Sequence, residues 1–258
     1  MSERSDVLFG IHAVESALKI RPRDIRVLQV AAGRDDQRLA GLITLAKNQG
    51  VEVEKVERAK LKQLDLGRHQ GAVAWLHARP ASAPDRRAWV EADLPELLAQ
   101  SPQPHLFLVL DSVTDPHNLG ACLRSADAAG VTAVLIPKDK SADITPTVAK
   151  VACGAAETVT VVKVTNLARS LETLKAAGVW IYGLAGEGQQ TLYELDLVGS
   201  VALVMGAEGD GLRRLTRETC DALVKLPMNG AVTSLNVSVA TGVSLFEVVR
   251  QRSLVKPV

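Results

Sequence analysis

The sequence predicts an α/β protein with two folded parts, and three observations support this. Short runs rich in Val, Leu and Ile alternate with helical patterns through residues 105–258, which is typical of a mostly parallel sheet covered by helices. A smaller alternating unit occupies residues 1–77. Five of the eleven prolines fall within residues 80–104. We therefore expect a domain at 1–77, a proline-rich linker at 78–104 with one or two helical turns around its apolar patch at 94–98, and a second domain at 105–258.

The first unit is small, and local patterns define its elements. Apolar residues at helical spacing predict helices over 10–20 and 36–49, the second closed by Gly50. Strands are predicted over 25–32, 51–56 and 71–76. Residues 1–75 hold 13 Lys or Arg against 10 Asp or Glu. This small positive excess fits an RNA-binding surface and an ordinary solvated surface equally well.

The second unit contains six apolar runs that predict strands. They are residues 106–110, 133–136, 159–164, 179–184, 201–205 and 222–226. Helices are predicted between most of them, at 119–129, 146–156, 167–177 and 212–219. The last stretch, 234–252, is the longest helix candidate, because apolar residues recur every three or four positions. These residues are Leu235, Val239, Val243, Phe246 and Val249.

Composition excludes several other classes of protein. No apolar run approaches the roughly 18 residues of a membrane helix, and the first residues are polar rather than signal-like. The three cysteines lie far apart and form no CxxC pair, which argues against a zinc site. We expect a cytoplasmic protein that needs neither membrane nor metal.

Three segments carry residues suited to chemistry, and the first runs from Asp111 to Arg124. It leaves a predicted strand and opens a helix, at the edge where open α/β sheets bind ligands. Asn118 stands where an N-cap is expected, and small residues before Arg124 would leave its guanidinium free to reach past the helix start. A capped helix with a surface arginine would show the same pattern.

The second segment is the glycine-rich stretch 206–211, which directly follows a predicted strand. Its spacing is GxxGxG, whereas a dinucleotide-binding turn reads GxGxxG. Glu208 and Asp210 would repel a pyrophosphate, so a neutral or cationic ligand such as a methylsulfonium fits better. A similar glycine string, 183–188, follows the preceding strand. Each string alone could also be a plain turn.

The third segment, 226–238, joins the last strand to the last helix. Pro227 and Gly230 interrupt regular structure there. Ser234 is the expected N-cap, and Asn236 would lie in the first turn. Polar groups at a helix start suit a carboxylate or another anion, although ordinary capping explains them too.

Together the three segments resemble the signature of the SpoU family of RNA ribose 2′-O-methyltransferases. The fixed positions read DxxxDPxNxGxxxR, GxEGxG and PMxGxxxSLNVS, in order. The resemblance implies a SPOUT α/β trefoil-knot domain with a mostly parallel sheet, which binds S-adenosyl-L-methionine in the knot and forms a homodimer. Residues 10–14 and 71–73 resemble the L30e-like RNA-binding domain of one branch, whose members methylate a guanosine in the peptidyl-transferase P loop of 23S rRNA.

The resemblance also implies roles for individual residues. The implied catalytic residues are Asn118, Arg124, Glu208, Ser234 and Asn236. The implied cofactor-binding residues are Leu184, Gly206, Leu226, Met228 and Leu235. We expect Arg124 to hold an RNA phosphate and to stabilise the developing alkoxide, because a guanidinium stays protonated and makes a poor general base. We expect Asn118 and Asn236 to orient these groups, and Glu208 to fix Arg124 or a dimer contact.

Other functions stay open at this point. A related enzyme could methylate tRNA or another rRNA site, and a non-catalytic RNA-binding protein could keep the same fold. A nicotinamide-dependent oxidoreductase is disfavoured because the chain lacks the corresponding glycine pattern.

Overall fold

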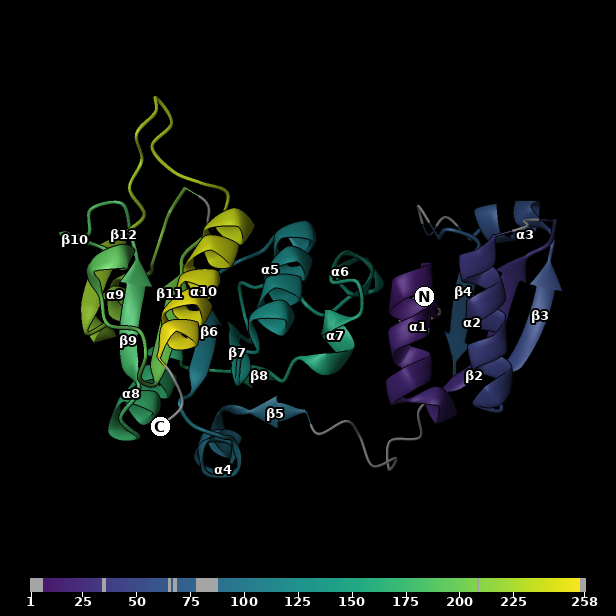
Figure 1. The fold of residues 1–258 in the computed structure, drawn as a ribbon, viewed down its shortest axis with the longest axis horizontal. Coiled ribbons are helices and arrows are strands. Elements are labelled where there is room, and N and C mark those ends of the chain that lie inside the picture. The colour runs from purple at the N-terminus through teal and green to yellow at the C-terminus, as the bar shows by residue number, and fades with distance from the viewer. Residues whose placement is uncertain are drawn as a thin grey trace. The chain divides into compact units, whose positions relative to one another are not determined.

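The computed structural model describes residues 7–33, 36–64, 66, 69–77, 88–207 and 209–255 of the chain. The chain divides into two compact units (Figure 1). Residues 1–84 and 143–158 form the first, and residues 85–142 and 159–258 form the second.

The first unit contains a four-stranded sheet in the order β1-β4-β2-β3. Its strands are β1 (Val7–Phe9), β2 (Ile25–Ala31), β3 (Glu52–Val56) and β4 (Ala72–Leu76). Its helices are α1 (Ile11–Ile20), α2 (Gln37–Asn48), α3 (Arg58–Lys62), α6 (Pro146–Val151) and α7 (Ala155–Thr158), with a 3₁₀ turn at Pro22–Asp24. The two helices and three strands predicted before residue 77 are confirmed. The pattern missed β1 and α3 because three and five residues are too short to show a period.

The helix predicted over 146–156 is broken in two. Cys153 and Gly154 adopt φ values of 52° and 101°, which no α-helix contains. Gly154 also lies against α1, because a Cβ there would come within 2.0 Å of the Ser16 Oγ. The break therefore lets two short helices, α6 and α7, form where the apolar pattern predicts one.

The second unit is an eight-stranded sheet in the order β10-β12-β9-β11-β6-β7-β8-β5. Each pairing between neighbouring strands is parallel. The six predicted strands are β6 (Leu106–Leu110), β7 (Ala133–Pro137), β8 (Val161–Val164), β9 (Trp180–Leu184), β11 (Val201–Met205) and β12 (Ala222–Lys225). The edges add β5 (Trp89–Val90) and β10 (Gln190–Thr191). The central strands β6 and β11 are buried throughout, which explains why they read as unbroken apolar runs.

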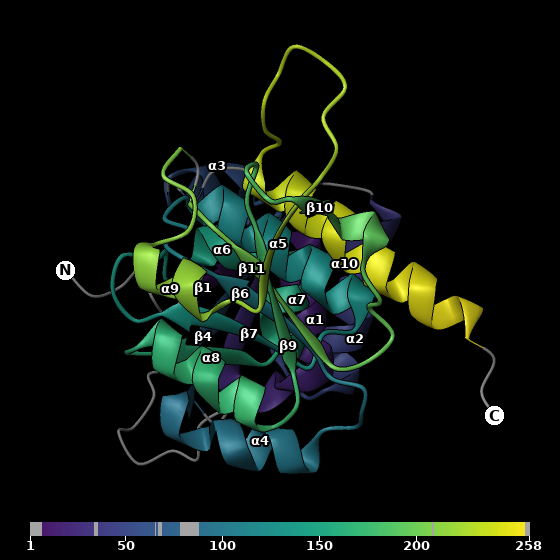
Figure 2. The same ribbon diagram turned by 90° about the vertical axis from the view of Figure 1, so that its left-hand side faces the viewer.

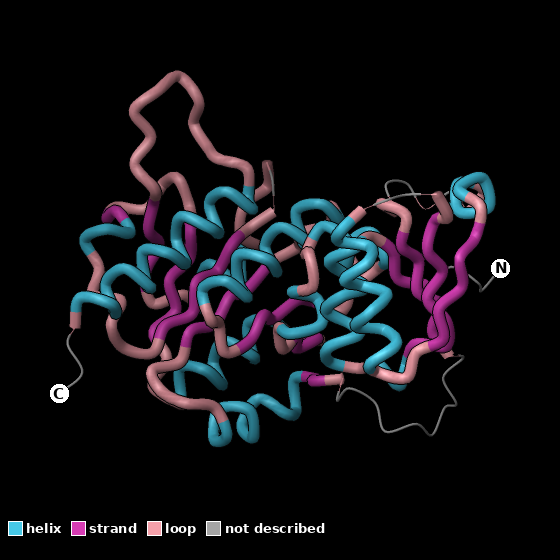
Figure 3. Tube along the Cα trace, turned by 45° about the vertical axis from the view of Figure 1, so that its right-hand side comes forward, coloured by secondary structure: helices cyan, strands magenta, loops and turns pink. Residues whose placement is uncertain are grey.

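Helices cover this sheet on both faces, with α4 and α8 on one side and α5 and α10 on the other (Figure 2). Their bounds are α4 (Leu94–Gln100), α5 (Pro116–Ala129), α8 (Leu167–Ala176), α9 (Arg214–Thr219) and α10 (Val237–Leu254), and 3₁₀ turns lie at Glu91–Asp93 and Leu192–Glu194. The loop from 226 to 236, between β12 and α10, extends away from the sheet (Figures 1 and 3).

Part of the range predicted as a linker is structured. Residues 89–100 form β5, a 3₁₀ turn and α4, and Leu94 and Leu97 join the core of the second unit. Pro95 is compatible with α4 because it stands in the first turn of the helix. Residues 78–87 of the predicted linker lie outside the described residues.

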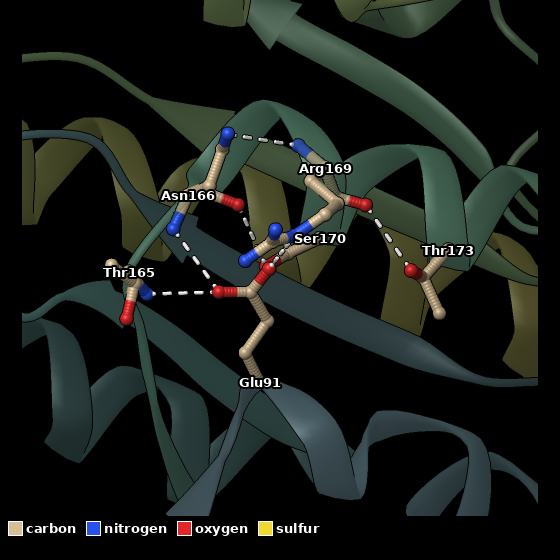
Figure 4. A network of polar contacts seen from close by, with 6 residues as sticks. All are labelled: Glu91, Thr165, Asn166, Arg169, Ser170 and Thr173. Carbon is tan, nitrogen blue, oxygen red and sulfur yellow. Dashed lines mark hydrogen bonds and ion pairs between the residues drawn. The ribbon is translucent and has the colours of Figure 1, made fainter.

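Glu91 attaches this segment to the start of α8 (Figure 4). Its Oε2 accepts hydrogen bonds from the backbone N–H groups of Thr165 and Asn166, at 3.0 and 3.1 Å. Its Oε1 accepts a hydrogen bond from the Nε of Arg169 at 2.5 Å. The Arg169 bond, assisted by the two backbone bonds, lowers the pKa of Glu91 below its ordinary value. Sequence patterns could not show this anchor, because its partners lie more than 70 residues apart.

The apolar pattern of α10 does not mark its buried face. Val239, Val243 and Phe246 are 51%, 36% and 48% exposed. The buried side carries Val237, Leu245 and Val248 together with the polar Thr241 and Ser244. Helix α10 packs on α5, where the Cys122 Sγ lies 3.4 Å from the Thr241 Oγ1. The expected apolar stripe therefore lies beside the packed face rather than on it.

Candidate active site

A cavity of about 700 Å³ lies where the loops after β9, β11 and β12 meet the start of α10. These three strands are neighbours in the parallel sheet, so their carboxyl ends share one edge. All five residues expected to bind the cofactor line it, and they are Leu184, Gly206, Leu226, Met228 and Leu235. Ser234 and Asn236 line it as well. We call this space the first cavity.

The glycine-rich stretch forms a tight loop beside the first cavity. Ala207 and Gly211 exchange two backbone hydrogen bonds of 3.0 Å. Gly209 and Gly211 have φ values of 84° and 66°, a left-handed conformation that favours glycine. A Cβ on Gly206 would come within 2.3 Å of the Gly211 carbonyl carbon. The glycines therefore serve two left-handed dihedrals and a close approach of one side of the loop to the other.

The lining of the first cavity fits a ligand that is partly apolar and partly cationic. Its volume lies within the range of roughly 300–1,000 Å³ that is common for small-molecule sites. Apolar side chains such as Leu226 and Met228 could contact an adenine ring, and the carboxylates of Glu187 and Asp210 could offset a sulfonium charge. Glu187 forms an ion pair with Arg217, which also lines the cavity.

A second cavity of about 660 Å³ adjoins the first. The two share Ala207, Asp210, Gly211 and Val237. The second cavity is further lined by Ser112, Val113, Thr114, Asp115, Asn118, Lys140 and Arg213.

A hydrogen bond joins the linings of the two cavities. The Nδ2 of Asn236 donates to the Oδ1 of Asn118 over 2.9 Å. Asn236 lines the first cavity and Asn118 the second. Two asparagines that are 118 positions apart in the chain therefore meet where the cavities adjoin.

The two helix starts differ from the expected caps by a few residues. Asp115 caps α5 by accepting a hydrogen bond from the His117 N–H, and Asn118 lies within the first turn that follows. Pro116 explains this, because its fixed φ suits the first helical position. Asn236 caps α10, and its Oδ1 accepts bonds from the N–H and Oγ of Ser238. Ser234 thus lies in the loop before the helix.

The remaining two expected catalytic residues are Arg124 and Glu208. Arg124 is exposed on α5 and lines neither the first nor the second cavity. Glu208 lies outside the described residues. The structure therefore places Asn118, Ser234 and Asn236 in the linings of the cavities, and Arg124 belongs to neither lining.

An ion pair that sequence reasoning missed lies beside the second cavity. Asp111 directly follows β6 and is fully buried. Its Oδ2 accepts a hydrogen bond from the Arg213 backbone N–H at 2.9 Å, and its Oδ1 accepts one from the Arg213 Nε at 2.5 Å. The available signal was the carboxylate at the end of an apolar strand, since a buried charge requires a partner.

Two other classes of site are absent from the described ranges. No cluster of three or more His, Cys, Asp or Glu residues there could hold a metal ion. Among the same residues, no helix combines the length and apolarity needed to cross a bilayer.

Comparison with known proteins identifies both parts of the chain. Residues 105–246 match the SpoU rRNA Methylase family, and residues 7–80 match the RNA 2′-O ribose methyltransferase substrate-binding family. The 23S rRNA (guanosine-2′-O-)-methyltransferase RlmB of Pseudomonas putida is 54% identical over 247 residues, which cover 96% of this chain and 97% of that protein. The Escherichia coli K12 protein of the same name is 52% identical over 250 residues, covering 96% of this chain and 100% of that protein.

Solved structures show the same fold. An RNA 2′-O ribose methyltransferase superposes with a TM-score of 0.79 at 26% identity, covering 98% of this chain and 91% of that one. The SpoU methyltransferase AviRb from Streptomyces viridochromogenes, in complex with AdoMet, superposes with a TM-score of 0.74 at 22% identity, covering 96% and 90%. The mostly parallel sheet of the second unit is consistent with the SPOUT fold. The chain therefore belongs to the SpoU rRNA methylase family.

Proposed function

We propose that this protein transfers the methyl group of S-adenosylmethionine to the 2′-hydroxyl of a guanosine in 23S rRNA. The observation that carries the proposal is the Asn118–Asn236 hydrogen bond, which connects a cavity suited to the cofactor with a second cavity open to substrate. The names of relatives that are 52–54% identical over nearly the whole chain support the choice of RNA and base.

The first cavity would hold the cofactor. Gly206 would keep the loop beside the cofactor closed against Gly211, while Leu226, Met228 and Leu235 would contact the apolar part of the cofactor. The bound cofactor supplies an electrophilic methyl group on a positively charged sulfur. The lining carries two carboxylates, Glu187 and Asp210, and two cations, Arg217 and Lys225, and the carboxylates would offset the sulfonium charge.

The ribose hydroxyl is a weak nucleophile at neutral pH, so the protein must position it and assist the loss of its proton. Because Asn236 donates a hydrogen bond to the Oδ1 of Asn118, the amide N–H groups of Asn118 can donate to the hydroxyl oxygen. Ser234 lies on the same loop as Asn236. Arg124 would hold the adjoining phosphate and stabilise the alkoxide as it forms.

Because Arg124 lines neither cavity of its own chain, we propose that the complete site requires a homodimer. The exposed apolar side chains of α10, Val239, Val243 and Phe246, offer a face for a second copy. Arg124 from one protomer would then serve the cavities of its partner. Helix α5, which carries Arg124, packs directly on α10.

For the domains, we propose that residues 1–77 bind RNA and that residues 105–258 carry the methyltransferase, with 78–104 between them. The exposed basic residues of α3 support an RNA-facing role for the first part. Residues 89–100 belong to the second compact unit.

Methylation of defined RNAs tests the proposed function. Purified protein should incorporate labelled methyl from S-adenosylmethionine into a 23S rRNA transcript, and the modified position should be a guanosine ribose. Equal or greater methyl incorporation into tRNA would show that tRNA, rather than 23S rRNA, is the substrate. Absence of incorporation into any RNA, in a preparation that binds S-adenosylhomocysteine, would favour a non-catalytic RNA-binding protein.

A further inference from the structure

The second cavity contains an arginine whose position is set by a fully buried carboxylate. Asp111 uses one oxygen for the backbone N–H of Arg213 and the other for its Nε. A buried carboxylate without such a partner is strongly destabilising. The pair therefore holds both the backbone of Arg213 and the base of its guanidinium at the carboxyl end of β6.

The other end of the guanidinium is available to a ligand. The Arg213 side chain is 44% exposed and lines the second cavity. Neither Nη1 nor Nη2 has a hydrogen-bond partner within the described part of the chain. The two terminal nitrogens form a fork of parallel donors with a fixed geometry.

The charges of the cavity indicate which ligand this fork serves. Its lining combines two cations, Lys140 and Arg213, with two carboxylates, Asp115 and Asp210. Both carboxylates would repel a phosphate, whereas a neutral base would not be repelled. Guanine presents the acceptors O6 and N7 to an arginine fork and carries donors that a carboxylate can accept. Adenine places an amino donor where guanine has O6, so it would oppose the fork.

We propose that the second cavity receives the guanine base of the target nucleotide, and that Arg213, positioned by Asp111, reads its O6/N7 edge. Asp210 is available to accept hydrogen bonds from the donor edge. Asn118 lines the same cavity and bonds to Asn236 of the first cavity, so a base held here carries its ribose toward the site of methyl transfer. This proposal rests on the proposed function and adds the origin of its base selectivity.

A cycle that combines a protein variant with a base analogue tests this proposal. Full-length wild type and Arg213→Ala are assayed on a synthetic RNA whose mapped target is either guanosine or 7-deazaguanosine, which lacks the N7 acceptor. Wild type should lose about tenfold in kcat/KM on the analogue. Arg213→Ala should be slow on both RNAs and should no longer distinguish them. Arg214→Ala is the matched control, because Arg214 pairs with Glu218 and lines neither cavity; it should keep the tenfold preference.

Two further measurements separate folding from recognition. Arg213 does not line the first cavity, so S-adenosylhomocysteine should bind Arg213→Ala as it binds wild type. If Arg213→Ala does not fold, Asp111→Asn combined with Arg213→Met removes both charges together and should show the same loss of discrimination.

The proposal is overturned if wild type ignores the N7 substitution, or if the Arg213 variants retain the wild-type preference. An equal loss on both RNAs with a preserved ratio, and a shallower salt dependence, would make Arg213 a phosphate-binding residue. A wild type that methylates neither RNA would refute the proposed function itself.

Discussion

The Nδ2 of Asn236 lies 2.9 Å from the Oδ1 of Asn118, and this hydrogen bond joins the first turn of α5 to the cap of α10. Asn236 therefore has two functions in the structure. Its Oδ1 caps α10 by accepting the Ser238 N–H, while its Nδ2 orients Asn118. Substitutions that keep one function and remove the other can separate stability from catalysis.

Asn236→Asp should keep the stability of the protein and lose most methylation. Aspartate caps a helix about as well as asparagine, but it cannot donate to Asn118. Asn236→Ala should lose both functions, with a fall in the free energy of unfolding of about 1 kcal/mol. Urea unfolding and single-turnover methylation measure the two effects. Near wild-type turnover by Asn236→Asp would show that the bond to Asn118 is not needed for the reaction.

Arg124→Ala should abolish methylation while the protein stays folded, because the residue is exposed on α5. Arg124→Lys should also be severely impaired, since one ammonium cannot replace a planar fork. Mixing the Arg124→Ala and Asn236→Ala proteins should restore activity if each site draws these residues from different protomers. Failure of the mixed dimer to regain turnover, with subunit exchange verified, would place both residues in one chain.

Gly206→Ala should weaken cofactor binding severely. The added Cβ would fall within 2.3 Å of the Gly211 backbone, so the loop beside the first cavity must shift. Titration calorimetry with S-adenosylhomocysteine measures the affinity. Gly41→Ala is the control, because no atom lies within 4 Å of its Cβ position in α2; binding should be unchanged, and stability should rise by up to about 1 kcal/mol. Unchanged affinity of Gly206→Ala for S-adenosylhomocysteine would show that this loop does not contribute to the cofactor site.

Glu91 should make stability depend on pH in the acidic range. Its folded-state pKa is lowered, chiefly by the hydrogen bond from Arg169, so its contribution is complete above the unfolded-state pKa of about 4.3 and disappears as pH falls through the folded-state value. Glu91→Gln should therefore cost about 1 kcal/mol at pH 7 and much less near pH 3.

The matched control for Glu91 is Glu172→Gln, at an exposed position of α8. It should change stability little at either pH. Chemical unfolding of the three proteins at both pH values gives the comparison. A Glu91→Gln penalty that is equal at pH 7 and pH 3 would show that the charge does not anchor the segment.

Replacement of Arg58, Lys60 and Lys62 by Ala should weaken RNA binding and leave cofactor binding intact. These side chains are exposed on α3 in the first unit. The salt dependence of RNA affinity should become shallower, because the variant neutralises fewer phosphates than wild type does. Lys19→Ala is the control, because Lys19 already pairs with Glu15. Full RNA affinity in the triple variant would show that α3 is not part of the RNA-binding surface.

The order of elements followed from the sequence because it depends on local signals. Apolar runs of about five residues predicted the buried strands such as β6 and β11, and their order along the chain predicted a mostly parallel sheet. Local signals failed where an element was too short, as in β1, or where tertiary packing reversed the pattern. On α10, packing against α5 buried the face with Thr241, Leu245 and Val248 and left Phe246 exposed, because the helix carries two apolar stripes and only its partner selects one.

The residue types of the site, and the loops that carry them, could be predicted from the sequence alone. The resemblance of three segments to the family signature pointed to Asn118, Ser234 and Asn236 as site residues. The folded chain was needed to show that Asn118 bonds to Asn236, that Asp111 positions Arg213, and that Arg124 lines neither cavity of its own chain. Local signals could not show these contacts because the bonded partners are separated by more than 100 residues. The parallel order β12-β9-β11-β6 brings the loops that carry them to one edge of the sheet.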